Sequence, residues 1–97
     1  MRIEWSIFAR TDRDAIFDYI ENDSPQGAIT VDDRIRAQVE SLEQFPKSGH
    51  IEDTRELIIQ RTPYIVAYRI AARTVRILRI LHAARRWPEE MFDEPTG

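Results

Sequence analysis

The spacing of apolar residues changes near Arg55, and this change limits the folds that the chain can adopt. Before this point apolar residues recur every three or four positions, which is typical of amphipathic helices. After it the chain turns to β-branched, aliphatic and aromatic residues, and three strands are predicted at 57–59, 64–70 and 75–81. The turn predicted at 71–74 carries only a weak hairpin signal, because it has neither Gly nor Asn. Helices that precede a block of strands indicate an α+β domain.

Two helices are predicted in the first half of the chain. Ser6 is a suitable N-cap for the first helix, and Ser24 followed by Pro25 marks the start of the second. The expected buried positions of the first helix are Ala9, Ile16, Tyr19 and Ile20, and those expected to face solvent are Asp12, Arg13, Asp14 and Asp18. The apolar stripe of the second helix is Ala28, Val31, Ile35, Val39 and Leu42. The break between them is only a few residues long, so an antiparallel helical hairpin is expected, followed by a polar loop at 47–54.

At the N-terminus, Ile3 and Trp5 alternate with charged neighbours, which predicts a short half-buried strand. The predicted order is therefore β-α-α-β-β-β, with the hairpin packed on one face of a mostly antiparallel sheet. A chain of 97 residues suits one domain, 1–97, with 89–97 expected to be a flexible acidic tail. No apolar run approaches the length of a bilayer span and no signal peptide is visible, so a cytoplasmic protein with no membrane contact is predicted.

Charge is divided along the chain. The formal net charge is -3, yet residues 1–54 hold six basic and twelve acidic side chains, whereas 55–87 hold eight Arg and one Glu. Four more acidic residues lie in 88–97. The strand region is therefore strongly basic between two acidic segments. This distribution indicates a basic surface that faces an anionic partner.

Three arginines, Arg69, Arg76 and Arg79, interrupt the apolar pattern of the last two strands. A sheet covered by helices on one side leaves its other side free for such guanidinium groups, which bind carboxylates or phosphates well. Strand alternation places Arg76 and Arg79 on opposite faces unless a β-bulge intervenes. Tyr64 and Tyr68 share one strand face, where packing in the core is the favoured interpretation.

A second cluster, His82, Arg85, Arg86 and Trp87, follows the last predicted strand. A histidine acting as acid or base beside an arginine that stabilises a phosphate is the chemistry of a ribonuclease. No Lys, Tyr or carboxylate stands close by in sequence before Glu89, so a structural role for His82 is favoured. The chain has no Cys and two His, and neither a metal site nor a cofactor is predicted.

In order and spacing, residues 3–88 resemble the RelE/ParE toxin superfamily, and most of all ParE of the ParDE type II toxin–antitoxin systems, a group also called plasmid stabilisation proteins. The matching residues are 3–6 with Ala9 and Asp12, 16–20, Ser24 and Pro25, Leu42 with Pro46 and Gly49, 54–57, 62–65 with Tyr68 and Arg69, and 77–82 with Ala84, Arg85, Trp87 and Pro88.

The two branches of this superfamily imply different functions. Resemblance to ParE implies a toxin that is not an enzyme and that inhibits DNA gyrase. Resemblance to RelE implies a ribosome-dependent mRNA endoribonuclease, whose residues here would be Arg69, His82 and Arg85. The catalytic sets expected of such nucleases are incomplete in this sequence, because its only Lys is Lys47 and no Tyr follows Tyr68. Gyrase inhibition is therefore favoured, with the nuclease as the alternative and an inactive adaptor of the same fold as a third hypothesis.

Resemblance to ParE also implies a partner. A ParD-like antitoxin is expected to neutralise the toxin by laying an acidic segment on it in a hetero-oligomeric complex, with DNA contacted only through the antitoxin. The residues predicted to bind partners are Arg69, Arg76, Arg79, Arg85, Arg86 and Trp87.

Overall fold

The computed structural model describes residues 1–46 and 54–85, and of Arg85 only the backbone. The elements follow the order β1 (Arg2–Trp5), α1 (Ile7–Glu21), α2 (Pro25–Glu40), a 3-10 turn (Ser41–Glu43), β2 (Arg55–Ile58), β3 (Tyr64–Ala71), β4 (Thr74–His82) and a second 3-10 turn (Ala83–Arg85). This α+β order confirms the predicted fold. The predicted tail at 89–97 and most of the loop at 47–54 lie outside the described residues. Within 1–46 and 54–85, no helix is long and apolar enough to cross a bilayer.

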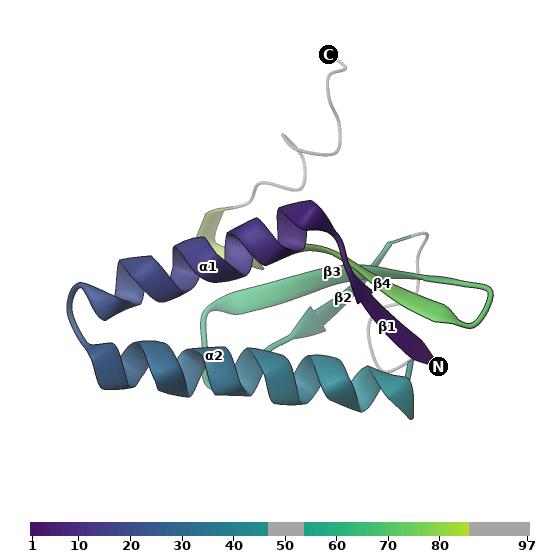
Figure 1. The fold of residues 1–97 in the computed structure, drawn as a ribbon, viewed down its shortest axis with the longest axis horizontal. Coiled ribbons are helices and arrows are strands. Elements are labelled where there is room, and N and C mark those ends of the chain that lie inside the picture. Colours follow the sequence, from purple (N-terminus) through teal and green to yellow (C-terminus); the bar gives the residue numbers. More distant parts are fainter. Residues whose placement is uncertain (47–53, 86–97) are drawn as a thin grey trace, which may run out of the picture.

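Both helices begin at the predicted serines. The hydroxyl oxygen of Ser6 accepts a hydrogen bond from the backbone N of Ala9, and that of Ser24 accepts one from Gly27, at 2.9 Å in each case. Pro25 is the first residue of α2, where its missing N–H costs nothing. The two helices lie antiparallel and are joined by a short turn (Figure 1). Capping residues alone thus place the hairpin correctly.

The four strands form one mixed sheet in the order β1-β4-β3-β2. β1 runs parallel to β4, whereas β4 with β3 and β3 with β2 are antiparallel. The hairpin packs on one face, and we call the opposite face the outer face. The core between helices and sheet consists of Ala9, Ile35, Val39, Leu42, Leu57, Ile59, Tyr64, Val66, Tyr68, Val75, Ile77 and Ile80. Ile35, Val39 and Leu42 belong to the predicted stripe of the second helix, and burial of both tyrosines confirms that they pack.

Three expectations about α1 are wrong. Tyr19 was expected in the buried stripe, but it is 74% exposed because it lies on the side of α1 that turns away from α2 and the sheet. Asp12 and Arg13 were expected to face solvent, yet both are half-buried. Each is drawn inward by an oppositely charged partner on a neighbouring element, as described below.

A β-bulge in β4 changes which arginines share a face. Ala67 pairs with Arg79, but the next residue of β3, Tyr68, pairs with Ile77, so Leu78 is an extra residue in β4. Because of this insertion, Arg76 and Arg79 pair with Arg69 and Ala67, which are two residues apart in β3. Residues two apart in a strand lie on one face. The bulge therefore places both arginines on the outer side of the sheet.

Ala72 occupies the strained position of the β3–β4 hairpin. The strands pair up to Ala71 and Thr74, so the loop has two residues, and Ala72 has φ 55°. A left-handed conformation is costly for alanine and natural for glycine. We expect Ala72→Gly to stabilise the protein by about 0.5 to 1 kcal/mol. Urea unfolding measures this change, and Ala71→Gly, in the adjoining strand, is a control expected to destabilise.

Candidate partner-binding surface

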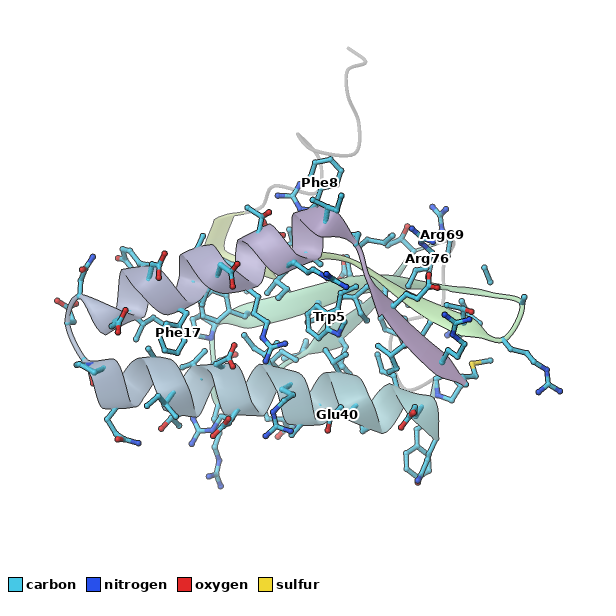
Figure 2. The ribbon with its side chains drawn as sticks, viewed as in Figure 1. Trp5, Phe8, Phe17, Glu40, Arg69 and Arg76 are labelled. Atoms are coloured by element: carbon cyan, nitrogen blue, oxygen red, sulfur yellow. The ribbon has the colours of Figure 1, made fainter. Side chains whose placement is uncertain are left out.

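Arg69 and Arg76 form a pair on the outer face. They lie directly opposite each other on β3 and β4, and both side chains are exposed (Figure 2). Like charges placed opposite each other across a sheet destabilise it unless anions lie nearby. Two guanidinium groups side by side are also well suited to bind a carboxylate or a phosphate. We call these two exposed residues the Arg69–Arg76 pair.

Glu4 partly neutralises this pair. It pairs with Arg76 across the parallel β1–β4 contact, and its carboxylate accepts a hydrogen bond from the Arg76 guanidinium at 3.2 Å. The other oxygen of Glu4 accepts one from Arg2 at 3.1 Å. One carboxylate is thus shared by two arginines, and among the described residues Arg69 has no ion pair or side-chain hydrogen bond. The outer face therefore keeps a positive charge at this end.

Arg79, which is also among the residues predicted to bind a partner, is engaged within the molecule. Its Nε and Nη2 donate to the two oxygens of Asp12 at 2.8 and 3.0 Å, and its guanidinium lies 5.8 Å from the ring centre of Phe8. The hydrogen bonds to Asp12 raise the pKa of Arg79, against the effect of its burial. Asp12 also accepts from the backbone N of Ile80 at 2.9 Å. Arg79 thus ties α1 to the edge of β4.

His82 is the last residue of β4 and pairs with Tyr64. The two rings meet edge-on, with their centres 5.4 Å apart. Nδ1 of His82 accepts a hydrogen bond from the backbone N of Ala84 at 3.1 Å. Arg69 is five positions from Tyr64 along β3, roughly 17 Å, and odd spacing places it on the other face. The structure therefore does not bring Arg69 and His82 together as a nuclease centre.

The side chains of the remaining predicted site residues, Arg85, Arg86 and Trp87, lie outside the part of the chain that the structure describes. No group of three or more potential metal ligands gathers among the described residues.

Sequence reasoning missed a groove between the two helices. It has a volume of about 530 Å³ and is lined by Trp5, Arg10, Arg13, Asp14, Phe17 and Asp32. Arg13 bridges the helices by donating from Nε and Nη2 to the two oxygens of Asp32 at 2.7 and 3.0 Å, and it lies 5.0 Å from the ring centre of Trp5. The hydrogen bonds that Arg13 donates to Asp32 raise the pKa of Arg13. Figure 2 shows Trp5 and Phe17 in the region between α1 and α2. In the sequence this region of α1 shows only a run of charged residues, a pattern that indicates a solvent-exposed helix face and not a groove.

A helical hairpin packed on a mixed sheet of four strands is consistent with the α+β fold of the RelE/ParE toxins. The family model of the ParE toxin of the type II toxin–antitoxin system parDE matches residues 3–87. The chain belongs to this ParE toxin family and is a type II toxin of the RelE/ParE superfamily.

Individual relatives agree with this assignment. The chain is 43% identical to the "Putative toxin Y4kP" of Sinorhizobium fredii over 91 residues, which are 91% of this chain and 94% of the relative. It is 36% identical to Toxin RelE2 of Caulobacter vibrioides over 86 residues, or 87% and 97% of the two chains. A solved structure of the chromosomal ParDE system from P. aeruginosa contains a similar chain, with a TM-score of 0.74 and 30% identity, covering 84% of this chain and 95% of that one.

Proposed function

We propose that this toxin acts in the cytoplasm by inhibiting DNA gyrase, without catalysing a reaction of its own. Family membership supports a toxin, and the positions of Arg69 and His82 are the observation that favours gyrase over mRNA. A general acid or base and a phosphate-stabilising cation must lie within a few ångströms of one reacting phosphate. These two residues lie on opposite faces, and Nδ1 of His82 already accepts a hydrogen bond.

The test compares two assays on one antitoxin-free preparation: DNA supercoiling by gyrase, and cleavage of mRNA on translating ribosomes. We expect loss of supercoiling and intact mRNA. His82→Asn is the informative variant, because the amide oxygen of Asn preserves an acceptor near the position of Nδ1 while removing the titratable group. It should inhibit gyrase as well as the unaltered toxin does. Intact supercoiling together with mRNA cleavage that His82→Asn abolishes would establish the nuclease instead.

The proposal includes a ParD-like antitoxin that neutralises the toxin by direct binding. A similar chain occurs in a ParDE system, which supports an antitoxin partner. The Arg69–Arg76 pair is exposed and carries uncompensated charge, so it is suited to an acidic segment of such a partner. Arg79 is less suited, since Asp12 already holds its guanidinium.

We expect R69E and R76E each to weaken antitoxin binding by up to about tenfold, because each charge-assisted contact contributes about 1.5 kcal/mol or less where it stays exposed. Isothermal titration calorimetry at two salt concentrations measures this loss and its screening. Arg61→Glu is a control matched to either single reversal, because Arg61 is exposed in the turn between β2 and β3 and, within the described residues, only its backbone oxygen takes part in a hydrogen bond. If the control variant weakens antitoxin binding equally, the loss comes from the change in net charge and not from contacts at the outer face.

A further inference from the structure

One long edge of β2 has no neighbouring strand, because β2 is the last strand in the order β1-β4-β3-β2. In an antiparallel pair, alternate residues direct their backbone N–H and C=O groups toward the partner strand. The backbone N of Ile59 donates to the oxygen of Tyr64 at 3.0 Å, so Ile59 faces β3. By the same alternation Glu56, Ile58 and Gln60 direct their backbone groups to the free edge. Such an edge is a template on which another chain can pair.

Gln38 of α2 occupies part of this edge. Its Nε2 donates to the backbone oxygen of Ile58 at 3.2 Å, and its Oε1 accepts from the backbone N of Gln60 at 2.6 Å. An oxygen and the nitrogen two residues further on are the two groups that one residue of a parallel neighbouring strand would use. One turn earlier in α2, Arg34 donates to the backbone oxygen of Arg61 at 3.3 Å. Side chains of α2 therefore close one end of the β2 edge.

The rest of the edge is open. No strand among the described residues pairs with the outward-facing backbone groups of Glu56 or with the N–H of Ile58. The side chain of Ile58 is 67% exposed beside them. In antiparallel pairing a residue of this kind exchanges its N–H and its C=O together with one partner residue. Ile58 cannot make that exchange while Gln38 holds its oxygen.

A second copy of this chain fits the edge once it is opened, because β2 is complementary to itself in the antiparallel orientation. In the register centred on Leu57, Glu56 of one copy exchanges two hydrogen bonds with the partner's Ile58, and the symmetric exchange occurs on the other side. This register places each Glu56 carboxylate opposite an isoleucine. A register centred on Glu56 would instead set two carboxylates directly opposite each other, which is destabilising. Each exchange in the favoured register uses the Ile58 oxygen that Gln38 holds.

We propose that Gln38 keeps the free edge of β2 closed, and that its amide prevents antiparallel pairing of β2 with β2 of a second copy of this chain. The device keeps the toxin monomeric at an edge that would otherwise join two sheets. The proposal rests on the fold alone, so it depends neither on gyrase inhibition nor on a ParD-like partner.

Gln38→Met tests the proposal, because Met has a similar length and helix propensity but can form neither hydrogen bond. We expect the unaltered protein to sediment as a monomer of 11.4 kDa and Q38M to form a dimer over the same concentration series. Amide hydrogen exchange locates the contact. The N–H groups of Glu56 and Ile58 should exchange at least about tenfold more slowly in concentrated Q38M than in the unaltered protein.

Further variants separate edge pairing from other effects. Gln26→Met, the same substitution at an exposed position of α2, is the matched control and should stay monomeric. Q38M/E56P should also be monomeric, because Pro removes an N–H of the free edge while leaving the pairing with β3 in place. Q38M/E56Q, which loses the same charge but keeps the N–H, should remain a dimer.

Gln38→Asn is a second way to open the edge, because its shorter side chain cannot reach both backbone groups. Monomeric Q38M and Q38N would overturn the proposal. Association that leaves the amides of Glu56 and Ile58 in fast exchange would overturn it too, since another surface would then hold the copies together. Slow exchange of these amides in the unaltered protein would show an edge that pairs despite Gln38, with the same consequence.

Discussion

Ile35→Ala is expected to cost about 3 to 4 kcal/mol of unfolding free energy and to lower Tm by about 15 °C. Ile35 has no exposed surface and belongs to the core cluster in which α2 meets the sheet. Its truncation removes buried methyl and methylene groups, and it leaves a cavity that the rigid sheet cannot fill by collapse. In a domain of 97 residues this is a large share of the total stability. Thermal and urea unfolding of the purified protein measure both quantities.

The same substitution at Ile29, six residues before Ile35 in α2, is the control. Ile29 is 46% exposed and lies outside the core cluster, so Ile29→Ala should cost less than about 1 kcal/mol. Both variants change helix propensity by the same amount, so their difference isolates burial. Comparable losses from the two substitutions would mean that α2 is not held against the sheet as described here.

The sequence predicted elements whose signals are local. The helix starts could be predicted from Ser6, Ser24 and Pro25, because capping depends on residues within one turn. The stripe that includes Ile35 and Val39 and the runs around Tyr64 and Ile77 likewise depend only on period and composition. The same signals predicted helices on one face of a mostly antiparallel sheet, whereas the strand order β1-β4-β3-β2 and the parallel β1–β4 pair were not predicted.

The features that remained hidden involve residues distant in sequence. Nothing near Leu78 signals a bulge, since it arises from how β4 pairs with β3. Asp12 and Arg13 look like ordinary solvated charges on a helix, and their partners, Arg79 and Asp32, lie 67 and 19 residues away. The strand arginines therefore differ in their surroundings, which the sequence did not reveal. Arg69 and Arg76 are exposed, whereas Arg79 forms an ion pair with Asp12 of α1.

Asp12→Asn is the second substitution with a large expected effect, about 2 kcal/mol or roughly 10 °C in Tm. The carboxylate accepts three hydrogen bonds, two from Arg79 and one from the backbone N of Ile80. β1 ends at Trp5, so this stretch of β4 has no neighbouring strand on that side, and Asp12 supplies the missing acceptor. An amide offers one oxygen and turns an NH2 group toward the guanidinium. The residual exposure of both side chains keeps the loss below that of a fully buried pair.

Asp18→Asn, at an exposed position of the same helix, is the control for lost charge and should change stability by less than about 0.5 kcal/mol. Adding Arg79→Met to Asp12→Asn should recover part of the loss, since the unpaired guanidinium is then removed as well. Additive losses would show that the two residues do not interact. Charge reversal of Arg79 would also loosen α1 from β4, so a loss of partner binding in such a variant would not by itself identify a contact with Arg79. Variants of Arg69 test the outer face most directly, because Arg69 has no ion pair among the described residues, whereas Arg76 also bonds Glu4 of β1.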